Sequence, residues 1–196
     1  MKSAHPGANR AKEPRPTFFY LLDLVLIAWV LEAMDQFFLR GWLDSFGVRP
    51  GRISGLIGIP LMPWLHGGFG HLFSNTLPFL TLGYIMVKAE GRRFIYSSTM
   101  IILLGGFGTW LIAAKGTVHV GASGLIYGYF GYVMTRALIE KRPVWLLIGI
   151  AVALFYGGMI FGVLPQNGLA ISWQGHLAGM LAGIWLGRQH KGLRSE

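Results

Sequence analysis

Three polar residues in otherwise apolar segments, Asn75, Ser123 and His176, are of the types that acyl transfer requires. A serine hydroxyl becomes an effective nucleophile when a neighbouring base accepts its proton, and imidazole titrates near neutrality. A side-chain amide can donate to the oxyanion that forms. Because no carboxylate lies near His176 in the later apolar segments, the pattern predicts a Ser123–His176 dyad rather than a triad.

Two neighbours extend this constellation. His71 lies four residues before Asn75 and shares its face of a helix, so that both can donate to an oxyanion. Ser123 is expected near a helix N-terminus, where its backbone N–H is also free to donate. Tyr127 follows Ser123 by four residues on the same face and can stack on the imidazole of His176 or form a hydrogen bond with it.

The composition indicates the setting of these residues. The chain has 196 residues, of which 53% are hydrophobic and 13% charged, and it contains no cysteine. High hydrophobicity excludes a disordered chain, and the absence of cysteine excludes a disulfide scaffold. A soluble domain carries roughly a quarter charged residues. The 29 glycines fit packed membrane helices, so the composition predicts an all-α polytopic membrane protein.

Hydropathy predicts six membrane-spanning helices, each close to the roughly 20 apolar residues that a bilayer requires. They cover residues 18–39, 71–87, 94–114, 120–138, 144–164 and 172–186. Pro143 and Pro165 bracket the fifth span, as prolines often do at helix boundaries. We expect one six-span domain over residues 17–188, between polar cytoplasmic tails at 1–16 and 189–196. The first tail lacks the apolar core of a signal peptide.

The basic residues predict the orientation. Of the 17 Lys and Arg, 13 lie in the two tails and in alternate connections, while the others are Arg40, Arg49, Arg52 and Lys115. The positive-inside rule then places both termini in the cytoplasm. The net charge of +9 is therefore a topology signal rather than a sign of nucleic-acid binding. The connection 40–70 is apolar but broken by prolines, so we expect it to lie partly in the outer membrane interface.

Measured from these basic residues, the candidate residues share one depth. Asn75, Ser123 and His176 lie 13, 13 and 12 residues before the basic residue that ends their span. At 1.5 Å per residue they lie roughly 18–20 Å above the inner boundary of a core about 30 Å thick. Since all three spans run from outside to inside, the three side chains are expected at one level.

Glycines predict how two of these spans approach each other. Gly175, Gly179 and Gly183 share a helical face with His176, and Gly121 and Gly124 flank Ser123. Small residues at this spacing allow close contact between helix backbones. The pattern therefore favours a contact that brings Ser123 and His176 within hydrogen-bond reach.

These segments resemble the rhomboid family of intramembrane serine proteases. The resemblance rests on residues 66–75 (HGGFGHLFSN), 121–128 (GASGLIYG) and 175–179 (GHLAG), and on the order Asn, Ser, His across a six-span core. It covers the second to sixth spans. In the small bacterial type that the chain resembles, the fold is a bundle of six transmembrane helices with a partly membrane-embedded first external loop.

The resemblance implies a function for each site residue. Ser123 would be the nucleophile and His176 the general base, with His71, Asn75 and the Ser123 N–H at the oxyanion. Tyr127 would lie beside His176, and His66 would be structural. The family cleaves transmembrane protein substrates that enter sideways past the fifth span, without a metal or cofactor, and a bacterial inner membrane is the expected location. One departure is at 56–58, where many members carry a Trp-Arg pair and this chain reads Leu-Ile-Gly.

Two other functions remain open at this point. Glu32 and Asp35 in the first span could mark the path of a small-solute or ion transporter, although they could instead pair with Arg40 or with groups of the external loop. An inactive rhomboid-like protein that binds membrane helices would also fit, although such proteins typically lack the Ser or the His. The histidines His66, His71 and His176 could suggest a metal site, but no Cys or carboxylate completes a ligand set.

Overall fold

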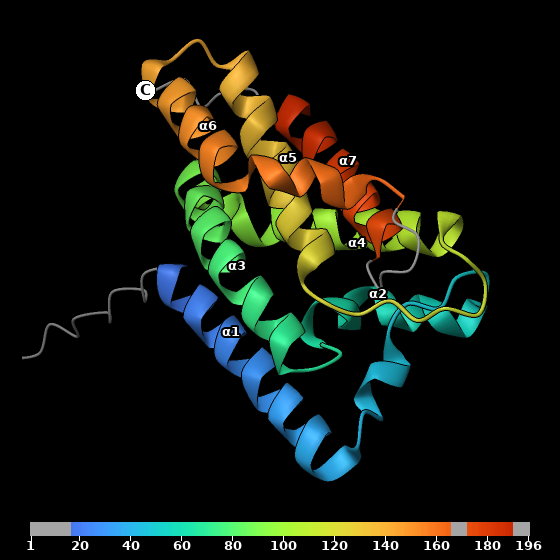
Figure 1. Ribbon diagram of the computed structural model, residues 1–196. Coiled ribbons are helices and arrows are strands. Elements are labelled where there is room, and N and C mark those ends of the chain that lie inside the picture. Colours follow the sequence, from blue (N-terminus) through green and yellow to red (C-terminus); the bar gives the residue numbers. More distant parts are fainter. Residues whose placement is uncertain (1–16, 166–171, 190–196) are drawn as a thin grey trace, which may run out of the picture.

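The computed structural model describes residues 17–165 and 172–189, and the named elements of this part of the chain are all helical (Figure 1). The predicted tail 1–16 and nearly all of the tail 189–196 lie outside the described residues. The longer helices are α1 (Thr17–Met34), α3 (Phe69–Glu90), α4 (Phe94–Ile112), α5 (Ser123–Ile139), α6 (Pro143–Tyr156) and α7 (Trp173–Gln189). The shorter helical turns are η1 (Asp35–Leu39), η2 (Leu43–Phe46), η3 (Ile53–Ile57), α2 (Gly58–Leu61), η4 (Met62–Trp64), η5 (Gly91–Arg93) and η6 (Gly157–Val163).

Each predicted span coincides with one of the longer helices. The fifth begins at Pro143, where the missing N–H of proline costs no helical hydrogen bond, and its helical structure ends with η6 at Val163, two residues before Pro165. By length and apolar composition, two helical stretches of the described chain are able to cross a membrane: Phe69–Ile112, which contains α3 and α4, and Pro143–Val163. The helices are thus confirmed, and the six-span count stays a prediction.

Helix α5 forms the centre of the bundle. It contacts α3, α4, α6 and α7 (Figure 1), and most of its residues are buried, including the large side chains Tyr129 and Tyr132. The surrounding helices instead expose large apolar side chains, such as Phe155 on α6 with 83% of its surface accessible. This arrangement places the first turn of α5, which begins at Ser123, inside the molecule.

The closest helix contact joins α5 to α7 through glycine. A Cβ added at Gly179 would lie 3.1 Å from the Cα of Gly124, and one added at Gly183 would lie 2.9 Å from the Cα of Gly128. Such distances leave no room for any side chain at these positions. The predicted glycine face of α7 therefore packs directly on the backbone of α5.

The connection between η1 and α3 folds back onto the bundle instead of extending away from it. Val48 pairs with His119 in an isolated antiparallel bridge, Met62 accepts a hydrogen bond from the N–H of Gly121 at 2.9 Å, and Ile59 packs where a side chain at Gly106 would be. The indole N–H of Trp110 donates to the carbonyl of Arg52 at 2.8 Å. This connection thereby fixes the loop that leads into Ser123.

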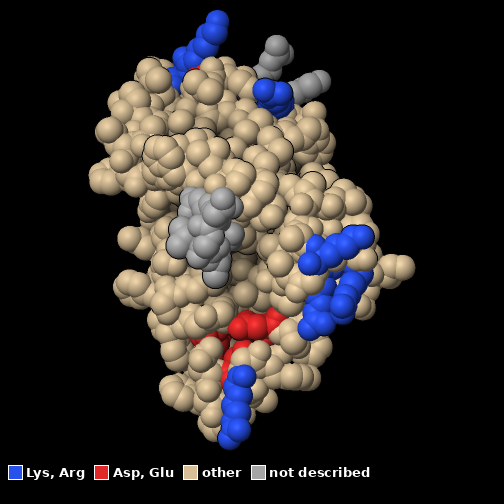
Figure 2. All heavy atoms as spheres, turned by 45° about the vertical axis from the view of Figure 1, so that its right-hand side comes forward, with Lys and Arg blue, Asp and Glu red and all other residues tan. Residues whose placement is uncertain are grey.

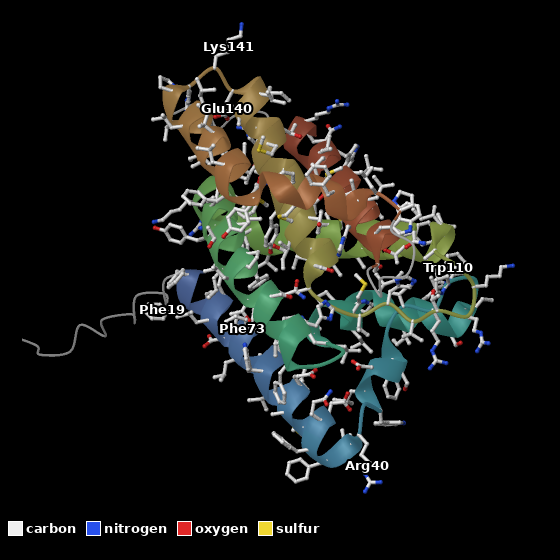
Figure 3. The ribbon with its side chains drawn as sticks, in the orientation of Figure 1. Phe19, Arg40, Phe73, Trp110, Glu140 and Lys141 are labelled. Carbon is white, nitrogen blue, oxygen red and sulfur yellow. The ribbon has the colours of Figure 1, made fainter. Side chains whose placement is uncertain are left out.

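Charged residues are sparse on the surface. On the face drawn in Figure 2 most of the surface is uncharged, with Lys and Arg in small groups and the acidic residues in a recess. Lys141 lies at one end of the bundle and Arg40 at the other (Figure 3). On the face drawn in Figure 2, the uncharged zone between the upper Lys and Arg and the group at the right is the surface that a bilayer would cover.

Candidate active site

A cleft of about 990 Å³ opens beside the first turn of α5. Its walls come from α3, from the loop before α5, from η6 and from the start of α7. Five of the predicted site residues contribute to it, and they are His71, Asn75, Ser123, Tyr127 and His176. The structure thus brings together side chains that are separated by as many as 105 positions (from 71 to 176).

Ser123 is the first residue of α5, where backbone N–H groups have no partner within the helix. The residues before it are fixed by several contacts: His66 Nε2 accepts a hydrogen bond from the N–H of Ala122 at 3.3 Å, and Gly121 adopts a φ of +114°. A residue with a Cβ would be strained at that φ. The loop fixed in this way holds Ser123 at the cleft. The backbone N–H of Ser123 points toward the start of the helix.

His176 is held from two sides. Its ring stacks on Tyr127, with centroids 4.1 Å apart and planes 9° from parallel, and its Nδ1 lies 2.9 Å from the carbonyl oxygen of Gly162 in η6. A carbonyl oxygen can only accept a hydrogen bond, so Nδ1 carries the proton. In the neutral ring Nε2 is then unprotonated, which is the form that can accept a proton from a serine.

No hydrogen bond joins Ser123 Oγ to His176 Nε2 in residues 17–165 and 172–189, although both side chains line the cleft. Catalytic hydrogen bonds are often long in a free enzyme and shorten when substrate binds. In the described structure both side chains therefore line one cleft, with Nε2 of His176 unprotonated and without a direct contact to the hydroxyl.

His71 and Asn75 converge on the loop that precedes Ser123. A Cβ at Gly121 would lie 2.8 Å from His71 Nε2 and 3.6 Å from Asn75 Nδ2, so glycine is required there for these side chains to approach the backbone. Asn75 Nδ2 is buried and has no hydrogen-bond partner among the described residues. An unused buried donor is costly, and Asn75 itself lines the cleft.

A polar wall of the cleft was not identified from the sequence. His119 Nδ1 lies 2.6 Å from Ser172 Oγ, and its Nε2 lies 2.8 Å from Thr117 Oγ1. The backbone carbonyl oxygen of Ser172 accepts a hydrogen bond from the N–H of His176 at 3.0 Å. His119 therefore links the loop before Ser123 to the turn that begins α7. The signal in the sequence is a histidine between two valines, two residues before Gly121.

His66 and the acidic residues of the first predicted span lie beside the cleft rather than in it. The ring of His66 packs edge-on against His71 at 5.2 Å, consistent with a structural function. Glu32 and Asp35 border a small recess with Asp44. Asp35 accepts a hydrogen bond from the N–H of Leu43 at 2.9 Å, whereas no ion pair joins it to Arg40 within the described chain. No group of histidines and carboxylates there could hold a metal ion.

The comparisons with known proteins identify the family of the chain. The family model for the Rhomboid domain matches residues 54–190, which include every residue described above in the cleft. The chain belongs to the rhomboid family. This rhomboid is accordingly a membrane protein, as the composition predicts.

The similarity to curated relatives covers more of the chain than the matched domain does. The uncharacterized protein Rv1337 of Mycobacterium tuberculosis is 40% identical over 189 residues, covering 91% of this rhomboid and 78% of that protein. The uncharacterized protein ML1171 of Mycobacterium leprae is 37% identical over 171 residues, or 84% and 67% of the two chains. YdcA of Bacillus subtilis, provisionally named a rhomboid protease, is 26% identical over 182 residues, or 87% and 86%.

Proposed function

We propose that this rhomboid is an intramembrane serine endopeptidase that hydrolyses peptide bonds in or near the transmembrane helices of other membrane proteins. The observation that carries the proposal is the His176 Nδ1–Gly162 hydrogen bond, because it leaves an unprotonated Nε2 at the cleft that Ser123 lines. Family membership and the provisional protease name of YdcA support the same reaction.

In the proposed first step Ser123 Oγ attacks the carbonyl carbon of the scissile peptide, and its proton passes to His176 Nε2. The electron pair of the carbonyl moves onto its oxygen. Donors from Asn75, His71 and the Ser123 backbone N–H stabilise that oxyanion. Asn75 Nδ2 is available for this task because it has no partner among the described residues.

Collapse of the tetrahedral species breaks the C–N bond, and the imidazolium of His176 gives its proton to the leaving amine. Water then attacks the acyl-enzyme while His176 accepts a proton from it. The second collapse releases the new carboxyl terminus and returns the proton to Ser123. Tyr127, stacked on the ring, holds His176 in one orientation through both half-reactions.

The proposed topology has six helices across the bilayer, both termini in the cytoplasm and the connection 40–70 partly in the outer interface. The bacterial relatives support a bacterial cell membrane. Substrates would be transmembrane proteins of that membrane, and the domain would comprise residues 17–188 between two cytoplasmic tails.

The experiment is covalent labelling of the purified protein with a fluorophosphonate, compared with Ser123→Ala. Labelling depends on an activated hydroxyl, so we expect a labelled wild type and an unlabelled Ser123→Ala. Ser74→Ala is the matched control, because Ser74 lines the same cleft and its hydroxyl donates only to the carbonyl of His71. The proposal is wrong if Ser123→Ala labels as strongly as wild type, or if a helical reporter is cleaved equally by both.

A further inference from the structure

The short helix η6 (Gly157–Val163) joins the outer end of α6 to the base of the proposed dyad. Its Gly162 carbonyl holds Nδ1 of His176, as described above. Two further residues face inward: Val163 is buried, and Met159 lines the cleft. Among the described residues, the ring of His176 also stacks on Tyr127 of α5 and its backbone N–H donates to Ser172, so η6 contributes the hydrogen bond that selects the tautomer.

Gly162 occupies this position because no larger residue fits. A Cβ there would overlap the hydroxyl of Tyr127, would lie 3.0 Å from Tyr127 Cζ, and would lie 3.4 Å from His176 Nδ1. The backbone of η6 therefore packs against the edge of the stacked Tyr127–His176 pair. In contrast, a Cβ at Gly158, four residues earlier in η6, would meet nothing within 4 Å.

The α6–η6 segment is packed against the bundle on one side and exposed on the other. Within α6 the buried residues are Gly149 and Val152, and Gly149 packs against Ala137 near the far end of α5. Beyond them Leu154, Phe155 and Phe161 are 78%, 83% and 65% exposed. The inward side of η6, with Met159, Gly162 and Val163, therefore holds the segment against the Tyr127–His176 pair.

We propose that Gly162 is a positioning residue whose carbonyl, carried on η6, sets the tautomer of His176. This inference rests on the proposed protease function and adds a positioning residue to that same site. When η6 is in place, Nδ1 is protonated and Nε2 can accept the Ser123 proton. Without this carbonyl the imidazole would lose the partner that fixes its proton on Nδ1.

Two variants of matched chemistry separate this function from simple packing. Gly162→Ala forces the segment away from Tyr127 and His176, whereas Gly158→Ala adds the same methyl group to open space in the same helix. We expect Gly162→Ala to label with a fluorophosphonate about tenfold to a hundredfold more slowly, since a well-placed general base contributes about 10²–10⁴. Gly158→Ala should label at the wild-type rate.

A second variant tests the geometry directly. The hydroxyl of Tyr127 occupies the place that the new Cβ would need, so the double variant Gly162→Ala/Tyr127→Phe should recover part of the rate that Gly162→Ala loses. If Gly162→Ala acted by unfolding the protein, removal of one hydroxyl would not restore activity. If the two single variants have independent effects, the double variant labels at the rate that the product of those effects gives. A double variant that labels no faster than this would overturn the steric coupling.

The tautomer itself is read by ¹⁵N NMR of histidine-labelled protein in nanodiscs, with His176 assigned by its loss in His176→Ala. The expected wild-type signal has a protonated Nδ1 and a bare Nε2, and this signal should persist in Gly158→Ala and be lost in Gly162→Ala. A wild-type His176 protonated on Nε2 would overturn the inference. This readout needs no activity, so an unlabelled wild type with the expected tautomer would refute the protease proposal and leave the positioning of His176 intact.

Discussion

Among single residues, His119 extends the site beyond the predicted constellation. It connects Ser172 to Thr117 through both of its ring nitrogens, and both partners are neutral hydroxyls. Its side chain is 7% exposed, and burial lowers the pKa of His119 below its ordinary value. The neutral ring is therefore the form that the folded protein stabilises.

This burial predicts a pH dependence of stability. The pKa of a histidine in an unfolded chain is about 6.5, so below that pH the unfolded state binds more protons at this position than the folded state does. The contribution of His119 is complete above about pH 6.5 and is lost as the pH falls from there towards the lower pKa of the folded protein. Thermal unfolding between pH 8 and pH 5 should show a smaller loss of stability in His119→Gln than in wild type.

Glutamine keeps a donor and an acceptor for the two hydroxyls but does not titrate. The other histidines titrate in both proteins, so the comparison isolates His119. An equal loss of stability in the two proteins would show that this ring is not held neutral by the fold.

The residues of the cleft differ in how far the sequence could predict them. Ser123, His176 and Asn75 could be found because each is a rare polar group at a countable distance from a basic boundary. The Gly162 carbonyl could not, because a backbone atom carries no residue-type signal and its partner is 14 positions away. His119 has a residue-type signal, but its importance depends on Ser172, which is 53 positions away.

Among the helices, the contact between α5 and α7 determines whether Ser123 and His176 share a cleft. Its glycine spacing could be predicted from the sequence, because a repeat of small residues on one face needs no tertiary information. The path of the connection 40–70 could not, because its bridge to His119 and its bond to Gly121 pair residues far apart in the chain. Apolar composition alone indicated that it was not a free loop.

This helix contact predicts opposite results for two Gly→Ala changes. Gly179→Ala would place a Cβ 2.8 Å from the carbonyl carbon of Gly124 and should destabilise the protein by about 1–3 kcal/mol through overpacking. Gly70→Ala lies in the first turn of α3, where a Cβ meets nothing within 4 Å, and should be neutral or stabilising because alanine favours helix over glycine.

Thermal unfolding in detergent, followed by fluorophosphonate labelling of the folded fraction, measures both effects. Gly179→Ala should also label more slowly, because separation of α5 and α7 moves His176 away from Ser123. Equal melting temperatures for the two variants would contradict the inference that the close contact between α5 and α7 holds Ser123 and His176 in one cleft.

For the whole molecule, hydropathy located every long helix because a bilayer allows few structures other than helices of sufficient length. Hydropathy does not by itself decide which helices cross the membrane. In the described chain, only Phe69–Ile112 and Pro143–Val163 are long and apolar enough to do so. Of the other long helices, α5 and α7 have 17 residues each, and α1 carries Asp23 and Glu32.

The distribution of Lys and Arg predicts which face of the molecule is cytoplasmic, and two matched substitutions test it. Lys141 lies in the connection between α5 and α6, and Lys115 lies in the connection between α4 and α5. Both residues are exposed, and the natural chain has no cysteine, so Lys141→Cys and Lys115→Cys each create a single reactive thiol. In intact cells whose outer face is accessible, a membrane-impermeant maleimide should modify Lys115→Cys and leave Lys141→Cys unmodified, and permeabilisation should make both reactive. The reverse pattern would invert the bundle and place the cleft at the cytoplasmic face, whereas equal modification in intact cells would mean that the helices between the two positions do not separate them across a bilayer.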